Sequence, residues 1–156
     1  MDGEAVQDDW LSALTRVEDG EWAGWWSFGG LDPFEDLTGP FYFRRGEDGR
    51  HRCAFRAARR HMNGAGVMHG GCLMTFADFG LFIIAQDALG GSRAVTATFN
   101  AELVGAVAES ARVECAGEVV KAGRSLVFVR GLITADGEPA MSFSGTLKRI
   151  GRAAKG

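Results

Sequence analysis

The sequence predicts an α+β fold in which a curved antiparallel sheet wraps around one long central helix. Residues 71–88 form the longest apolar segment, and Leu73, Phe76 and Leu81 lie on different faces of the helix that it would form. A helix that is apolar on most faces must be enclosed by the rest of the protein. Runs of alternating apolar and polar residues, typical of strands, lie on both sides of this segment, and short turn motifs separate them. A sheet that curves around the helix buries both kinds of apolar surface.

Six strands are expected from the alternation. Two come before the helix, at residues 41–44 and 52–57, and the Gly46-Glu47-Asp48-Gly49 turn between them predicts a hairpin. The four that follow the helix cover residues 95–103, 111–119, 126–134 and 141–147. Because turn residues at 121–124 and 135–137 separate the later strands, the sequence predicts an antiparallel meander.

The first 40 residues differ in composition, since they hold all four tryptophans. The spacing of Trp10, Leu11, Leu14 and Val17 predicts a short amphipathic helix, and residues 29–33 are typical of a loop. We expect an aromatic cap at residues 1–40, the main domain at residues 41–151 and a short tail at residues 152–156. The tryptophans either line a ligand pocket or anchor the cap, and both readings stay open.

Composition and charge narrow the class of protein. Apolar residues make up 46% of the chain and charged residues 24%, which is typical of one globular domain and not of a disordered chain. A formal charge of -3 gives little support to nucleic-acid binding. The acidic start is unlike a signal peptide, and no apolar stretch is long enough to span a membrane. The widely spaced Cys53, Cys72 and Cys115 are typical of reduced thiols. We therefore expect a soluble, cytoplasmic protein without nucleic-acid or membrane partners.

Asp78 is the unusual residue of the long helix, because an unpaired carboxylate is costly to bury among apolar residues. It is either a partly exposed surface residue or a functional group. The glycine-rich segment 63–71 precedes it and leads into the helix. Free N–H groups at a helix start suit an oxyanion or a phosphate, although paired glycines can also simply turn the chain. The combination predicts a catalytic site.

The spacing adds a constraint on that site. Gly71 and Asp78 share one face of the helix but lie roughly 10 Å apart along its axis. One substrate carbonyl cannot touch both in a single regular helix. An antiparallel helix from a second copy would bring Asp78 of one chain beside Gly70 of the other. We therefore expect a homodimer or homotetramer with a shared site.

The stretch from Asn63 to Asp78, Asn-x5-His-Gly-Gly-x6-Asp, resembles the signature of the phenylacetyl-CoA-type (PaaI-like) hotdog-fold thioesterases. The resemblance continues through the later strands to about residue 151. It implies a hotdog fold and hydrolysis of an acyl- or aryl-CoA thioester to free acid and CoA, without a cofactor.

The resemblance also implies roles for individual residues. The Gly70 N–H would form the oxyanion hole, Asn63 would assist it or fix the substrate, and His69 would hold the turn. Asp78 would act as general base or as nucleophile, with Thr96 in the place where some relatives use Ser to position water. Further candidates for substrate binding are Gly71 at the helix start, Gly123, Arg124 and Ser125 in a turn, and Arg149 and Arg152 near the end of the chain.

Other chemistries have less support in the sequence. No Gly-x-Ser-x-Gly elbow, P-loop or dinucleotide fingerprint occurs, and no short paired-ligand spacing indicates a metal. Cys72 near the helix start could act as a nucleophile, but its neighbours favour a packed core residue. A non-catalytic acyl-CoA-binding module and an enoyl-CoA hydratase remain the alternatives to a thioesterase.

Overall fold

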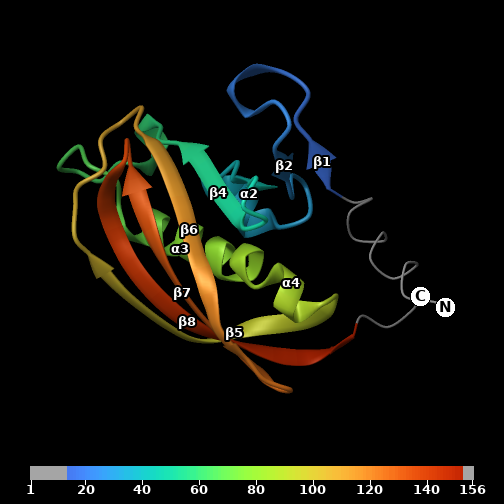
Figure 1. Cartoon of the computed structure of the whole chain (residues 1–156). Coiled ribbons are helices and arrows are strands. Elements are labelled where there is room, and N and C mark those ends of the chain that lie inside the picture. The colour runs from blue at the N-terminus through green and yellow to red at the C-terminus, as the bar shows by residue number, and fades with distance from the viewer. Residues whose placement is uncertain (1–13, 153–156) are drawn as a thin grey trace.

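An eight-stranded antiparallel sheet curves around one long helix, as the sequence predicts (Figure 1). The structure is a computed structural model and describes residues 14–152. The strand order is β1-β2-β3-β4-β6-β7-β8-β5. The strands are β1 (Thr15–Arg16), β2 (Trp26–Ser27), β3 (Tyr42–Arg45), β4 (His51–Arg56), β5 (Ser92–Leu103), β6 (Arg112–Ala122), β7 (Leu126–Ala135) and β8 (Glu138–Arg152).

The central helix, α3 (Gly70–Ile84), is shorter than the sequence predicts. The expected helix over residues 71–88 is interrupted at Ala85, and a separate turn of helix, α4 (Gln86–Leu89), follows. Beyond the break, the Asp87 carboxylate of α4 accepts two hydrogen bonds from the Arg45 guanidinium of β3. Gly90 then ends α4 in the left-handed conformation that glycine adopts readily.

The core lies between α3 and the concave face of the sheet. Phe76, Leu73 and Leu81 of α3 are completely buried there, against inward-facing residues of the strands such as Val113 and Ile133. The helix approaches the sheet so closely that a Cβ atom at Gly80 would lie 2.7 Å from the Cys115 sulfur. Only the opposite face of α3 is left to carry a site.

The predicted four-strand meander is wrong in one respect. Strands β6, β7 and β8 are joined in sequence, but β5 pairs with β8 at the far edge of the sheet and not with β6. The segment between β5 and β6 is too long for a hairpin. It buries Val107, whose carbonyl accepts a hydrogen bond from the Met68 N–H. This connection therefore supports the glycine-rich loop before α3.

The segment before β3 adds two short strands and a helix. Thr15 and Arg16 pair with β2, so the end of the helix predicted over residues 10–17 is instead a strand, and its start lies outside the described residues. Trp22 stacks on Tyr42, and the guanidinium of Arg112 lies 4.7 Å from the Trp22 ring centre. Trp22 and Trp25 are buried in this cluster against the sheet. These two tryptophans anchor the segment and line neither of the cavities described below.

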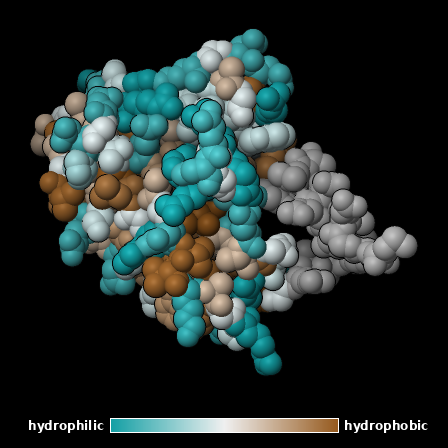
Figure 2. All heavy atoms as spheres, viewed as in Figure 1, coloured by the Kyte–Doolittle hydropathy of each residue, from teal (hydrophilic) through white to brown (hydrophobic). Residues whose placement is uncertain are grey.

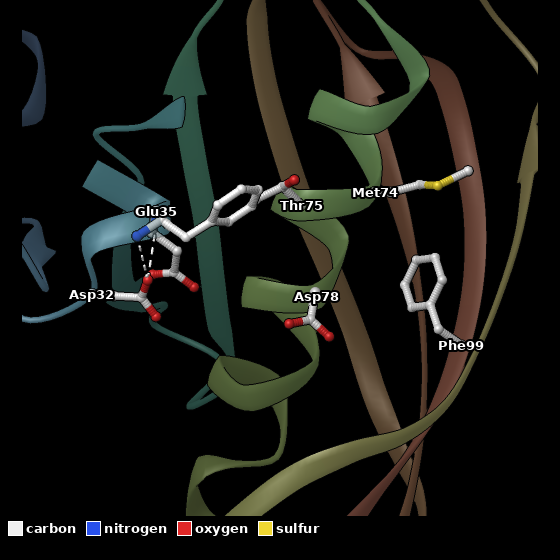
Figure 3. A pocket seen from close by; sticks show the side chains of 7 residues that line it. Asp32, Glu35, Met74, Thr75, Asp78 and Phe99 are labelled. Carbon is white, nitrogen blue, oxygen red and sulfur yellow. Dashed lines mark hydrogen bonds between the residues drawn. The ribbon is translucent and has the colours of Figure 1, made fainter. Parts of the chain in front are cut away.

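Helix α2 (Pro33–Thr38) begins at the last residue of the predicted loop 29–33 and covers residues for which the sequence predicts no element. Asp32 caps its start, since its carboxylate accepts hydrogen bonds from the Phe34 and Glu35 N–H groups at 3.1 and 3.0 Å. Helix α2 lies next to α3, on the side that the sheet does not cover (Figure 3). Among residues 14–152, no helix is both long and apolar enough to cross a membrane.

Candidate active site

The glycine-rich loop before α3 is held in place by Asn63. The side-chain oxygen of Asn63 accepts hydrogen bonds from the Ala65 and Val67 N–H groups, at 2.8 and 3.3 Å. The Asn63 N–H in turn donates to the Val67 carbonyl. The Asn63 oxygen thus closes the loop, and only its amide NH₂ group could reach a ligand.

His69 caps the start of α3 and leaves one backbone N–H free. Its Nδ1 atom accepts a hydrogen bond from the Gly71 N–H at 2.8 Å, and its carbonyl accepts from the N–H groups of Cys72 and Leu73. The Gly71 N–H is therefore occupied by the protein itself. Within residues 14–152, the Gly70 N–H has no hydrogen-bond acceptor, so Gly70 presents the open donor at the positive end of the helix.

Asp78 lies two turns further along the same helix and is half-buried. The Thr96 hydroxyl of β5 donates a hydrogen bond of 2.6 Å to its Oδ1 atom. The pairing of β5 with β8 is irregular between Thr96 and Thr98, and such irregularities often re-aim side chains next to sites. A carboxylate with one short hydrogen bond keeps its second oxygen available for a water or a substrate.

The free amide and the carboxylate lie too far apart to act together within one chain. Helix α3 is continuous from Gly70 to Asp78, eight residues later, which corresponds to about 12 Å along the axis. The structure thus keeps the separation that the sequence spacing implies. The shared site that we expect from it stays a prediction.

Two cavities lie along the outer face of α3. One has a volume of about 340 Å³ and contains Asp78. The other, of about 250 Å³, contains His69 and Gly71 at the start of the helix. Phe34 of α2 and Thr75 of α3 line both cavities, so the two are neighbours under α2. Asp78 and the neighbours of Gly70 thus border cavities along this face, whereas Gly70 itself lines neither cavity.

The Asp78 cavity is lined by a second helix that the sequence interpretation missed. Figure 3 shows Asp78 on α3, with Asp32 and Glu35 on one side of it and Met74 and Phe99 on the other. Burial, followed by the negative charges of Asp32, Asp78 and Asp36, raises the pKa of Glu35 to about 7. The signal was present in the sequence, because Asp32-Pro33-Phe34-Glu35 places an N-cap, a proline and an acidic residue at a helix start.

The other predicted binding residues lie elsewhere. Gly123, Arg124 and Ser125 form the turn between β6 and β7, where the Gly123 N–H donates to the Leu126 carbonyl. They line neither cavity of the described chain. The Arg149 guanidinium donates to the carbonyls of Ala88 and Leu89 at the end of α4, so it serves as a helix cap and not as a free cation. The side chain of Arg152 lies outside the described residues.

Cys72 is a packed core residue, as the sequence favours. Its side chain is buried, and burial raises the pKa of its thiol to about 11. The reactive thiolate is therefore scarce at neutral pH. Cys53 and Cys115 are also free, buried thiols. Asp78 remains the candidate nucleophile or base of the outer face of α3.

Comparison with known families decides between the possible classes of protein. Residues 65–141 match the model of the thioesterase superfamily, and this span contains His69, Gly70, Asp78 and Thr96. Just under half of the chain therefore resembles the thioesterase superfamily. The match confirms the resemblance to thioesterases that the Asn63–Asp78 pattern indicates. The match begins after α2, so the family model does not cover Glu35.

Individual relatives agree with the family and the fold. A Pseudomonas aeruginosa protein described as "putative esterase PA0474" is 43% identical over 49 residues, which are 31% of this chain and 37% of that protein. The chain thus matches little more than a third of the length of this curated relative. A variant of the phenylacetic acid degradation protein PaaI from Thermus thermophilus superposes with a TM-score of 0.65 at 24% identity, over 76% of this chain and all of that one. The BH2602 protein of Bacillus halodurans, solved with CoA, gives a TM-score of 0.71 at 22% identity, over 78% and 81%.

Proposed function

We propose that this protein hydrolyses an acyl-CoA thioester to a free acid and CoA, in a site that two copies of the chain build together. The observation that carries the proposal is the pair of groups on the outer face of α3, the open Gly70 N–H and the Asp78–Thr96 pair. The match of residues 65–141 to the thioesterase superfamily supports the reaction class. Related folds solved with CoA support CoA as the thiol part of the substrate.

Each group has a task in the proposed reaction. The substrate carbonyl oxygen accepts a hydrogen bond from the Gly70 N–H, where the helix dipole stabilises the negative charge that develops on it. Asp78 of the other copy removes a proton from the attacking water or attacks the carbonyl carbon itself. The Thr96 hydroxyl keeps the Asp78 carboxylate in one orientation. His69 holds the turn through the Gly71 N–H, and Asn63 holds the loop before it.

Self-association supplies what one chain lacks. Gly70 and Asp78 lie about 12 Å apart along α3, so one substrate carbonyl cannot contact both in a single chain. An antiparallel α3 helix from a second copy would bring the two groups together. Apolar side chains surround the open face of α3, since Met74 and Leu103 are 43% and 51% exposed. A Cβ atom at Gly70 would lie 3.1 Å from the Leu103 side chain, so this exposed leucine borders the free amide. We propose that a second copy covers this apolar rim and that cytoplasmic acyl-CoA reaches the cleft between the copies.

Release of free thiol from a panel of short, medium, long and aromatic acyl-CoAs tests the proposal. We expect turnover of at least one of them by the wild-type protein and a loss of at least about 10³-fold in the Asp78→Asn variant, which keeps the shape of the side chain. Glu47→Gln, an exposed substitution in the turn between β3 and β4, is the matched control and should keep wild-type turnover. Tight binding of every acyl-CoA without turnover would instead indicate a binding module, and loss of enoyl absorbance without thiol release would indicate a hydratase.

A further inference from the structure

A carboxyl group of α2 faces the proposed catalytic cavity without any partner. Glu35 lines the same cavity as Asp78, and its side chain is half-buried. Within residues 14–152, no hydrogen-bond donor or cation contacts the Glu35 carboxyl oxygens. A half-buried carboxylate without a hydrogen-bond donor or a cation is poorly stabilised, so the neutral acid form of Glu35 is favoured. The group is thus a proton carrier beside the reacting centre.

The position of Glu35 is fixed by the helix that carries it. Asp32 accepts the Glu35 N–H at the start of α2, and the Asp36 carboxylate accepts the Gly30 N–H from the preceding turn. The Glu35 carbonyl accepts the Gly39 N–H at 2.5 Å at the other end. These three bonds lie within α2 and its flanking turns, and they fix the backbone of this short helix. The Glu35 side chain is therefore presented to the cavity by a braced backbone.

We propose that Glu35, in its neutral form, is the general acid that protonates the departing sulfur of the thioester. This role rests on the proposed function. Asp78 takes a proton from water while the water oxygen bonds to the acyl carbon. The carbon–sulfur bond then breaks, its electron pair stays on sulfur, and the sulfur takes the Glu35 proton. The products are the acid and the thiol, and transfer of the proton from Asp78 to the Glu35 carboxylate restores both groups.

The charges around Glu35 explain why a proton donor is needed. Burial, followed by the negative charges of Asp32, Asp78 and Asp36, raises the pKa of Glu35 to about 7. Burial and the neighbouring Cys115, and least of all Glu35, raise the pKa of the Cys53 thiol of β4 well above its usual value. A free thiolate leaving into this negatively charged cavity would be repelled. A neutral carboxylic acid removes that repulsion by giving up its proton.

Dependence on the leaving group tests the proposal with the full-length protein. A CoA thiolate is basic and needs the proton, whereas an aromatic thiolate leaves without one. Glu35→Gln keeps the shape of the side chain but cannot donate a proton as an acid. At pH 6, we expect this variant to cleave the acyl-CoA roughly 10²-fold more slowly than the wild-type protein. It should cleave the S-(4-nitrophenyl) thioester of the same acyl group within about threefold of the wild-type rate.

The matched control is Glu47→Gln, which makes the same chemical change at an exposed position that lines neither cavity. It should show the wild-type rate ratio between the two esters at pH 6. In the wild-type protein, kcat/KM for the CoA ester should fall as the pH rises through about 7, because ionised Glu35 has no proton to give. This alkaline limb should be missing in Glu35→Gln. A melting temperature recorded for each variant checks that the fold is kept.

Two results would overturn the role of Glu35 alone. One is an equal loss of rate on both esters, which would make Glu35 a structural residue. The other is an unchanged rate and an unchanged alkaline limb in Glu35→Gln. A wild-type protein that releases thiol from neither ester would overturn the proposed function as well. Asp78→Asn, measured on the aromatic ester, tests the proposed function without the role of Glu35. Hydrolysis of that ester depends on Asp78 and not on Glu35.

Discussion

The hydrogen bond between Thr96 and Asp78 sets the orientation of the proposed catalytic carboxylate. Because the hydroxyl proton is donated at 2.6 Å, Asp78 must accept it as the ionised form or through its carbonyl oxygen. The added methyl group of Thr96, compared with the serine of some relatives, does not prevent this contact. Thr96 thus provides the same hydroxyl group as serine, and its side chain rotates less freely about χ1.

Replacement of Thr96 separates the hydroxyl from the methyl group. Thr96→Val keeps the shape but removes a hydrogen bond to a charged group, so we expect kcat/KM to fall roughly 10-fold. Thr96→Ser retains the donor and should stay within about threefold of the wild-type value. Steady-state thiol release by both variants checks this. Equal activity of Val and Ser at this position would show that the hydroxyl does not orient Asp78.

The Gly70 N–H can be removed without breaking the helix, because Gly70 is the first residue of α3. Proline is well tolerated at that position, and His69 before it already has the extended conformation that proline requires, with φ -63° and ψ 133°. Gly70→Pro should therefore fold but lower kcat roughly 10²- to 10³-fold, the usual effect of losing one oxyanion-hole donor.

Gly70→Ala is the matched control for this change, since it adds a Cβ atom and keeps the N–H. That atom would meet only the flexible end of the Leu103 side chain, at 3.1 Å. We expect Gly70→Ala to keep most of its activity in the same assay. A Gly70→Pro protein as active as Gly70→Ala would rule out the backbone donor at this residue.

At the scale of the elements, the sequence predicts the long helix and the six main strands because their apolar periods are strong. It fails where a few contacts outweigh local pattern. The break at Ala85 is followed by the Arg45–Asp87 ion pair, whose partners are far apart in the sequence. Helix α2 was missed because it has only six residues and no buried side chain, so it leaves no hydrophobic period to read. The residues of the candidate site also fall into those that local pattern predicts and those that depend on long-range contacts.

Residues of the site within one local motif were predictable. His69, Gly70 and Asp78 belong to one loop and helix, and their spacing is visible in the sequence. Arg149 was misjudged as a candidate for phosphates because its partners, the carbonyls of α4, are brought to it only by the pairing of β5 with β8. Glu35 was missed because nothing in the sequence places α2 beside α3. Long-range contacts therefore limit what the pattern alone can assign.

The cap that Arg149 gives to α4 should matter for stability and not for catalysis. Arg149→Met removes the donors of two charge-assisted hydrogen bonds at a half-buried site, so we expect the free energy of unfolding to fall by about 1–3 kcal/mol. Lys148→Met, at the exposed neighbouring position, should change it by less than about 0.5 kcal/mol. Urea denaturation measures both. Equal effects of the two substitutions would show that the Arg149 contacts do not hold α4.

For the whole molecule, the open face of α3 is the feature that one chain leaves incomplete. The sheet encloses the other side of the helix, and on the face seen in Figure 2 apolar side chains lie in separate patches among hydrophilic ones. Asp78, His69 and Gly71 line cavities on the side that α2 only partly covers, and Gly70 borders the exposed Leu103 side chain. A two-fold arrangement of antiparallel α3 helices would place each Gly70 near the other chain's Asp78 and would form two equivalent sites.

Mixing two inactive variants tests this arrangement directly. In a dimer of one Asp78→Ala chain and one Gly70→Pro chain, one site receives both substitutions, and the other receives an intact Gly70 and an intact Asp78. Random exchange makes half of the dimers mixed and restores one of two sites in each, so about a quarter of wild-type activity should return. Sites contained within single chains would give no recovery, because every chain carries one defect. Sedimentation of the mixture, before and after exchange under mild denaturant, checks that mixed dimers form.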